Sequence, residues 1–186
     1  MEIIPVEHGL DLLASDLVRS TGLHASQIYG DLFSDLEPTR YIKDGTPNTL
    51  KMAIGLAWEA WLERVFVRQG ILAERPGELM SEEGIAYSPD LFVVNGIPRI
   101  GEIKATWMSS QTDLTDPKFD KWIVQVKLYC YWAEMTGARF YVLFMNGNYR
   151  GNRDPEFKVW DIDFSPIELQ ENYQMIINHA VSKGLL

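Results

Sequence analysis

Residues 88–104 decide the fold, and they have the sequence SPDLFVVNGIPRIGEIK. Two runs of aliphatic and aromatic residues flank Asn95-Gly96, a pair that is typical of a hairpin turn. Glu102 and Lys104 are two residues apart on the second run, so their side chains share one face of a strand, while Ile103 points to the other. Buried charged groups are costly unless they have partners or a function. The stretch therefore predicts a β-hairpin that carries chemistry.

The length of the turn decides which face Asp90 occupies. A two-residue turn at Asn95-Gly96 would place Asp90 opposite Gly101 and point its side chain away from Glu102. A loop one residue longer, or a single bulge, would place Asp90 directly opposite Glu102. Pro98 cannot donate a hydrogen bond to a neighbouring strand and so favours an irregular connection. We therefore predict a bulged or odd-length hairpin.

Asp90 and Glu102 are suited to bind a hard divalent cation. Mg²⁺ takes oxygen ligands and commonly uses one or two carboxylates, which leaves positions for water and a substrate phosphate. Lys104 would then position a water molecule or stabilise the negative charge that grows on the phosphate. The hairpin thus predicts a cation site that acts on a phosphate ester.

The elements expected around this hairpin are those of an α/β sandwich with a mixed sheet. Residues 139–145 are nearly all apolar or aromatic, as expected of a strand buried on both faces. A capping box at Ser165–Glu168 predicts the start of the last helix. The sequence predicts two short helices within 8–34, helices over 46–69 (capped by Thr46, with Pro47 in its first turn), 118–136 (stopped by Gly137) and 166–181, and strands over 85–87, 91–94, 97–106 and 157–164.

Composition excludes several classes of protein. The 186 residues suit one domain, and the single cysteine, Cys130, excludes an internal disulfide, a Cys-based zinc site and an iron–sulfur cluster held by this chain. The net charge of −9 has the wrong sign for a protein that coats nucleic acid non-specifically. Residues 1–37 hold seven acidic and one basic residue, whereas residues 38–186 hold nineteen acidic and sixteen basic ones. The acidic excess therefore belongs mainly to the N-terminal segment.

Pro89-Asp90 followed by Glu102-Ile103-Lys104 resembles the signature of the PD-(D/E)XK nuclease superfamily. Three more segments, in matching order, resemble its RecB-like and lambda-exonuclease-type branch, so the resemblance covers about residues 24–131. These are His24-Ala25-Ser26-Gln27 with Pro38-Thr39-Arg40-Tyr41, the helix segment Gly55-Leu56-Ala57-Trp58-Glu59, and Gln125-Val126-Lys127-Leu128-Tyr129, which fits a Gln-x-x-x-Tyr motif. Glu37 stands where some RecB-like members have a cluster-binding cysteine. The chain therefore resembles the phage-type recombination exonucleases without an iron–sulfur cluster more closely.

The resemblance implies a restriction-endonuclease-like core, a mixed β-sheet flanked by helices. It implies a single nuclease domain over 1–186, with an N-terminal helical segment over 1–45 and a catalytic core over 46–186. The implied activity is that of a Mg²⁺- or Mn²⁺-dependent DNA nuclease with one or two ions, an exonuclease of DNA recombination, repair or phage DNA processing. An endonuclease of resolvase or restriction type, and a catalytically silent fold that binds DNA or protein, remain open.

The resemblance also implies the roles of individual residues. The expected metal ligands are Glu59, Asp90, Glu102 and the carbonyl of Ile103; the expected catalytic residues are Asp90, Glu102, Lys104 and Gln125; and the expected substrate-binding residues are Arg40, Gln125 and Tyr129. Glu63 competes with Glu59 for the helical ligand and is expected at the surface.

Expected partners are DNA and a single-strand-annealing or other recombination protein, and a homo-oligomer remains open. Residues 1–10 lack the basic start and apolar run of a secretory signal, and no apolar run approaches the ~20 residues of a membrane helix. We therefore expect no membrane association and a cytoplasmic location, in a bacterium or a phage-infected host cell.

Overall fold

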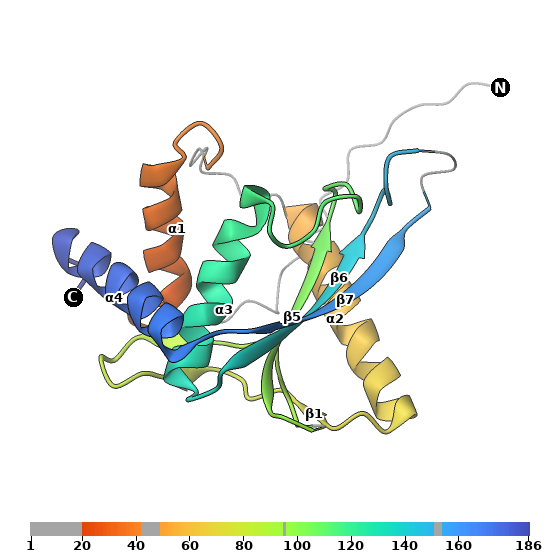
Figure 1. Ribbon diagram of the computed structural model, residues 1–186, viewed down its shortest axis with the longest axis horizontal. Coiled ribbons are helices and arrows are strands. Elements are labelled where there is room, and N and C mark those ends of the chain that lie inside the picture. The colour runs from red at the N-terminus through yellow and green to blue at the C-terminus, as the bar shows by residue number, and fades with distance from the viewer. Residues whose placement is uncertain (1–19, 42–48, 95, 151–153) are drawn as a thin grey trace.

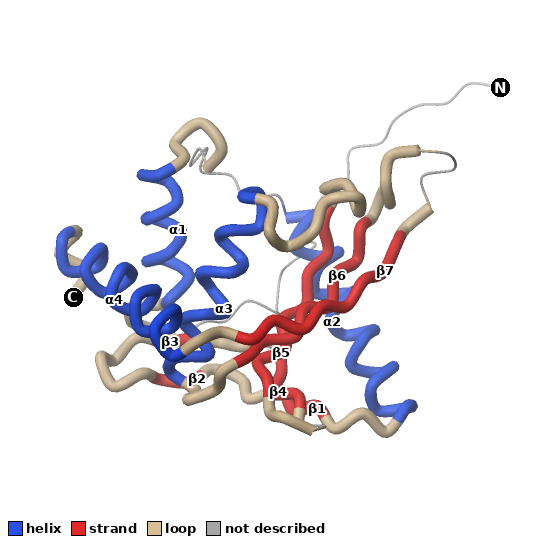
Figure 2. The backbone as a smooth tube through the Cα atoms, in the orientation of Figure 1, coloured by secondary structure: helices blue, strands red, loops and turns tan. Residues whose placement is uncertain are grey.

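The computed structural model describes residues 20–41, 49–94, 96–150 and 154–186. Its centre is a five-stranded sheet with the order β1-β4-β5-β6-β7 (Figures 1 and 2). The pair β5 and β6 is parallel and the other neighbouring pairs are antiparallel, which confirms the predicted mixed sheet. The strands are β1 (Ala73–Glu74), β4 (Leu91–Val93), β5 (Arg99–Thr106), β6 (Gly137–Phe144) and β7 (Glu156–Asp163).

Helices cover both faces of this sheet (Figure 1). They are α1 (Ala25–Leu36), α2 (Thr49–Gln69), α3 (Asp120–Trp132) and α4 (Pro166–Ser182). Side chains alternate along a strand, so β5 and β6 supply apolar groups to both sides. Ile103 and Tyr141 pack against α2, whereas Ile100 and Phe140 belong to a larger core shared with α1, α3 and α4. The prediction that β6 is buried on both faces is confirmed.

The β4–β5 hairpin has an odd-length connection. Leu91 pairs with Gly101 and Val93 pairs with Arg99, so five residues connect the two strands. Continuing this register by one residue places Asp90 opposite the residue after Gly101, which is the position that the odd-length hairpin predicts. That prediction is confirmed, although Asn95 of the expected turn lies outside the described residues.

Gly101 allows β4 and β5 to approach closely. A Cβ atom at this position would lie 2.9 Å from Leu91 Cβ and 3.1 Å from Val93 Cγ2. Contacts this short would force the strands apart, because packed side chains resist overlap. The glycine is therefore needed on the α2 face of the hairpin, opposite the face that carries the acidic residues.

The helix α3 ends earlier than the sequence predicts. It stops at Trp132 rather than Thr136, because Glu134 takes a left-handed conformation with φ 54° and turns the chain out of the helix. Gly137, which the sequence analysis assigns to the helix end, instead begins β6. A Cβ atom there would lie 2.3 Å from Arg99 Nη1, so this glycine makes room for the arginine.

The final helix α4 begins at the predicted capping box. Ser165 Oγ accepts a hydrogen bond from the Glu168 backbone N–H at 3.2 Å, and Glu168 Oε2 accepts one from the Ser165 N–H at 2.9 Å. The expected strand over 157–164 is β7, displaced by one residue.

The strand expected over 85–87 is confirmed as β3 (Ala86–Tyr87), whereas three other short elements were missed by the sequence prediction. β2 (Leu79–Met80) pairs with β3 (Ala86–Tyr87) in a separate two-stranded sheet, and β1 forms an edge of the main sheet. A 3-10 turn (Pro117–Phe119) precedes α3.

The N-terminal predictions fall partly outside the described residues. The second of the two short helices is α1, whereas the first lies in residues that the structure does not describe, as do Thr46 and Pro47. Among the described helices, none combines the length and apolar character needed to cross a membrane.

Candidate active site

The hairpin fixes two acidic residues on the face of the sheet that α3 covers. Asp90 directly precedes β4, and its Oδ2 accepts a hydrogen bond from the Ile103 backbone N–H at 2.7 Å. Glu102 lies in the middle of β5 and is fully buried. Burial raises the pKa of the Asp90 carboxyl, which the nearby Lys104 only partly offsets.

The two carboxylate oxygens of Glu102 differ in their hydrogen bonding. Its Oε1 accepts a hydrogen bond from Gln125 Nε2 at 2.7 Å and forms an ion pair with Lys104. Its Oε2 is buried and accepts no hydrogen bond from any residue that the structure describes. Burial, followed by the charge of Asp90, raises the pKa of Glu102 to about 8 against the opposing effect of Lys104. A buried acceptor without a donor is costly, so this oxygen is available to a ligand.

Lys104 lies two residues after Glu102 on the same face of β5, as the sequence predicts. Burial alone would lower the pKa of its ammonium group, but the carboxylates of Glu102 and Asp90 outweigh burial and raise it. The lysine therefore stays charged at neutral pH, in contact with one acidic residue and within the field of another.

The helix α2 contributes a third acidic residue from the edge of the sheet. Glu59 Oε2 accepts a hydrogen bond from Arg75 Nη2 at 2.8 Å, and Arg75 Nε lies 3.0 Å from Glu63 Oε1. Burial, followed by the charge of Asp90, raises the pKa of Glu59 to about 7, despite Arg75. The side chain of Glu59 is 20% exposed and that of Glu63 is 34% exposed. Glu59 is thus the more enclosed of the two competing glutamates.

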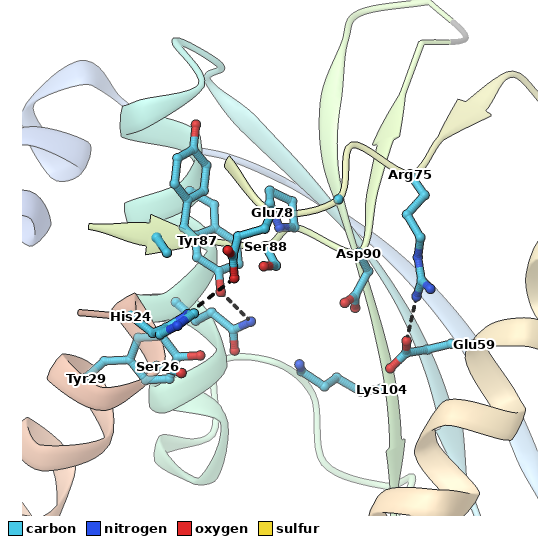
Figure 3. Close-up of a pocket in the computed structure, with 15 residues that line it drawn as sticks. His24, Ser26, Tyr29, Glu59, Arg75, Glu78, Tyr87, Ser88, Asp90 and Lys104 are labelled. Atoms are coloured by element: carbon cyan, nitrogen blue, oxygen red, sulfur yellow. Dashed lines mark hydrogen bonds and ion pairs between the residues drawn. The ribbon is translucent and has the colours of Figure 1, made fainter. Parts of the chain in front are cut away.

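Glu59, Asp90 and Lys104 line a pocket of about 570 Å³, whereas the fully buried Glu102 does not line it. Figure 3 shows Glu59, Asp90 and Lys104 converging on its centre from α2, from the residue before β4 and from β5. Glu63 does not line this pocket. The lining residues are His24, Ser26, Tyr29, Glu59, Arg75, Gly77, Glu78, Ala86, Tyr87, Ser88, Pro89, Asp90, Lys104, Gln125 and Tyr129.

The helix α3 supplies the Gln-x-x-x-Tyr pair on one face, as the spacing predicts. Gln125 Nε2 lies 3.5 Å from the Tyr129 hydroxyl in addition to its hydrogen bond to Glu102. Tyr129 is buried, which raises the pKa of its phenol well above the ordinary value. Both side chains line the pocket, and Gln125 also orients the Glu102 carboxylate.

Arg40 lies outside this pocket. Its guanidinium pairs with Glu37 Oε2 at 3.1 Å and donates to the Lys118 carbonyl at 2.8 Å, so it belongs to a neighbouring pocket. The structure therefore does not bring Arg40 together with the acidic residues.

Sequence reasoning missed two contributors to the pocket. Arg75 follows β1 and reaches Glu59 across sixteen residues, a separation without any helical or strand periodicity. His24, to which the sequence analysis gives no role, lines the pocket and lies 3.5 Å from Glu78 Oε2 through its Nδ1. No local pattern around either residue signals these contacts.

The donor set of the pocket fits a hard divalent cation. Asp90 and Glu59 line the pocket, and Glu102, with its buried free oxygen Oε2, contacts the pocket-lining Lys104. Burial raises the pKa values of all three carboxyl groups, and the charge of Asp90 raises those of Glu59 and Glu102 further. A cation with oxygen preference would offset the repulsion and use Oε2 of Glu102. The three carboxylates are spread more widely than 4.8 Å, with Glu59 paired to Arg75.

A tighter cluster occurs elsewhere. Ligand atoms of Asp31, Asp35 and His179 lie within 4.8 Å of one another, and they form the only such group of three among the residues that the structure describes. Lys183 Nζ already lies 2.6 Å from Asp35 Oδ2 and 3.9 Å from Asp31 Oδ2. A resident ammonium group therefore balances this cluster.

The architecture is similar to that of solved exonucleases. An alkaline exonuclease from Laribacter hongkongensis matches with a TM-score of 0.55 and 16% identity, over 87% of this chain and 89% of that chain. A phage related exonuclease from Haemophilus somnus matches with a TM-score of 0.50 and 16% identity, over 84% of this chain and 78% of that chain. No protein-family profile matches the chain, and a search of curated proteins finds no match. At these identities the similarity concerns the fold.

Proposed function

We propose that this chain is a Mg²⁺- or Mn²⁺-dependent nuclease that hydrolyses phosphodiester bonds in DNA, as an exonuclease of the RecB-like and lambda-exonuclease type. The observation that carries the proposal is the free buried oxygen Oε2 of Glu102. This carboxylate is held next to Lys104, which lines a pocket together with Asp90 and Glu59. Burying acidic groups around one lysine costs free energy of folding, and such a group of charges is suited to phosphoryl chemistry.

In this proposal Glu59, Asp90, Glu102 and the Ile103 carbonyl hold one or two ions. A divalent ion at such a site lowers the pKa of a bound water from ~15.7 towards neutrality and stabilises the oxygens of an in-line displacement. Arg75 pairs with Glu59 in the structure, so it competes with the ion for that carboxylate.

Lys104 and Gln125 act with Asp90 and Glu102 as the catalytic residues of the proposed reaction. Lys104 keeps its proton, so its ammonium group donates to the attacking water or to a phosphate oxygen and stabilises the growing negative charge. Gln125 uses Nε2 to fix the Glu102 carboxylate, and its remaining amide groups face the pocket for contact with substrate. Hydrolysis adds water across the phosphodiester and releases a phosphate monoester and a free hydroxyl.

We further propose that Tyr129 supports Gln125 in substrate binding and that Arg40 contacts the phosphate of a strand end. The names of the similar structures, both exonucleases, support DNA as the substrate and an end-directed activity. The proposed setting is recombination, repair or phage DNA processing in a bacterial or phage-infected cytoplasm, within a single domain of 186 residues.

The test is degradation of end-labelled double-stranded and single-stranded DNA in the presence of Mg²⁺ or Mn²⁺, with chelator as the control. The proposal predicts degradation by the wild-type chain and none with chelator. Failure of the wild-type chain to degrade DNA with either ion would overturn it, as would undiminished degradation by Glu102→Ala and Lys104→Ala. A covalently closed circle separates the two modes, because an exonuclease leaves it intact.

A further inference from the structure

A second pocket, of about 770 Å³, adjoins the first. Both pockets are lined by Ser26 at the start of α1, and the second extends from there along α1 towards the first turn of α3. Its lining includes three basic side chains, Arg40, Lys121 and Lys183, and one acidic side chain, Asp31. The second pocket therefore brings three basic side chains next to the proposed active site.

Two of these three cations already have partners. Lys183 Nζ lies 2.6 Å from Asp35 Oδ2, so a carboxylate neutralises its charge. Arg40 pairs with Glu37 and donates to two backbone carbonyls, at 2.8 Å and 3.4 Å. Each group must exchange contacts within the protein to bind a ligand, and this applies to Arg40 at the strand-end phosphate proposed above.

Lys121 differs from both of them. It forms no ion pair with any residue in the described part of the chain, and it lies half-buried at the first turn of α3. Its Nζ lies 4.9 Å from the ring centroid of Tyr41 and 5.8 Å from that of Tyr29, which is cation–π range. Burial, and after it the charge of Lys104, lowers the pKa of this amine. An anion bound at Lys121 would favour the charged form of the amine and so oppose the lowering of its pKa by burial and by Lys104.

The position of Lys121 on α3 connects the two pockets. Lys121, Gln125 and Tyr129 are spaced four residues apart and so share one face of the helix. Gln125 and Tyr129 line the first pocket and Lys121 lines the second. Lys121 is thus one helical turn, ~6 Å along the axis, from the glutamine that contacts Glu102. This rise is comparable to the separation of consecutive phosphates in a nucleic-acid strand.

We propose that Lys121 binds the phosphate next to the one that is cleaved, so that the strand runs from Gln125 along α3, past Ser26, into the second pocket. This inference rests on the proposed nuclease function, because it needs a polymeric substrate with several phosphates. A positively charged groove that follows the backbone is the usual way in which proteins hold a single strand. Lys121 is a binding residue here, since it lies away from the reacting atoms.

The first experiment measures binding without cleavage. The full-length chain in chelator is titrated into a fluorescein-labelled single strand of about 12 nucleotides, and the dissociation constant is measured by anisotropy between about 20 and 200 mM salt. Lys121→Met should weaken binding about fivefold at low salt and reduce the slope of log K against log salt by about 0.7, the loss of one phosphate contact. Lys121→Arg should retain both values.

Lys127→Met is the matched control. It removes the same charge from the same helix, but Lys127 pairs with Glu168 of α4 at 3.5 Å and lines neither of the two pockets. We expect its affinity and salt slope to stay within twofold of the wild-type values. If Lys121→Met and Lys127→Met behave alike while both remain folded by thermal unfolding, the inference is overturned.

A kinetic experiment separates this inference from the proposed function. With Mg²⁺ or Mn²⁺, Lys121→Met should raise KM for the oligonucleotide about fivefold with little change in kcat. It should cleave bis(p-nitrophenyl) phosphate, which has one phosphate, at the wild-type rate. A wild-type chain that cleaves neither substrate would refute the nuclease proposal, whereas an unchanged KM for the oligonucleotide in an active Lys121→Met variant would refute only the role of Lys121.

Discussion

The two faces of β5 are built in opposite ways. On the face towards α2, Ile103 packs with Leu91 and Tyr141 in an apolar cluster. On the face towards α3, the fully buried Glu102 forms an ion pair with the partly exposed Lys104, within the field of the Asp90 carboxylate. Apolar burial stabilises a fold, whereas buried charges usually cost stability and are retained for another reason. Under the proposed function, residues adjacent in sequence therefore serve stability and chemistry separately.

The largest effect is expected from a substitution on the charged face of β5. Glu102→Gln keeps the size of the side chain but removes the charge, and the proposed reaction should slow by about 10²–10³-fold or more, because groups that stabilise transition-state charge have effects of this size. Thermal unfolding in chelator should show a melting temperature equal to or above the wild-type value, because burial and the charge of Asp90 disfavour the charged form of Glu102 more than Lys104 favours it. A large drop in melting temperature would show that this face serves stability.

The next largest effect is expected from a substitution on the apolar face of β5. Ile103→Ala should lower the free energy of unfolding by about 2–5 kcal/mol, because the side chain is 2% exposed and its loss leaves a cavity. The backbone N–H that binds Asp90 is retained, so DNA cleavage well below the melting temperature should stay within a few-fold of wild type. Urea unfolding and the cleavage assay measure the two quantities, and Ile103→Val, with about 0.5–1.5 kcal/mol, gives the graded control. Loss of cleavage in a folded Ile103→Ala chain would contradict the separation.

Gly101→Ala tests whether the two faces are linked through the hairpin. The added methyl group would meet Leu91 and Val93 on the apolar face and cost about 1–3 kcal/mol of stability through overpacking. It should also move β4, and with it Asp90, so Mn²⁺ affinity measured by calorimetry should fall several-fold. Unchanged Mn²⁺ affinity in a destabilised variant would show that the acidic face tolerates movement of β4.

The charged face also predicts a dependence of stability on pH in chelator. The pKa values of Glu59 and Glu102 are raised from 4.5 to about 7 and about 8, so the folded chain retains protons that the unfolded chain releases. Their contribution to stability is therefore present below about pH 4.5 and is lost as pH rises through 7 and 8. We expect the melting temperature to fall by about 10 °C between about pH 5.5 and 8.5, and less in Glu102→Gln.

Mn²⁺ provides the complementary measurement. Because it competes with protons for the same carboxylates, it should raise the melting temperature more at about pH 8 than at about pH 5.5. A melting temperature that rises with pH in chelator, or a Mn²⁺ effect that is larger in acid, would contradict the assigned pKa directions.

Local signals allowed much of this fold to be predicted. The capping box at Ser165 fixed the start of α4, and the alternation of residues along a strand put Glu102 and Lys104 on one face and Ile103 on the other. The position of Asp90 relative to Glu102 followed from counting residues across the turn. These predictions depend only on neighbours in sequence or on one hairpin.

Tertiary contacts could not be predicted in this way. Arg75 meets Glu59, and Lys121 meets Tyr29 and Tyr41, only because separate elements pack together. The strands β1 and β2 have two residues each, too few for an alternating pattern. The end of α3 depended on Glu134, a residue type that takes a left-handed conformation less readily than the glycine that the sequence analysis favoured.

The odd-length connection between β4 and β5 sets a rule for natural variation. Because strand residues alternate between faces, inserting or deleting one residue in this connection would turn Asp90 towards α2 and separate it from Glu102, unless a compensating bulge arose. A change of two residues would preserve the arrangement. Relatives that retain the acidic pair should therefore differ in the length of this connection by even numbers, and odd differences should mark chains that have lost it. Whether the number of residues in this connection differs by an even or an odd number would thus indicate whether a relative retains the acidic pair.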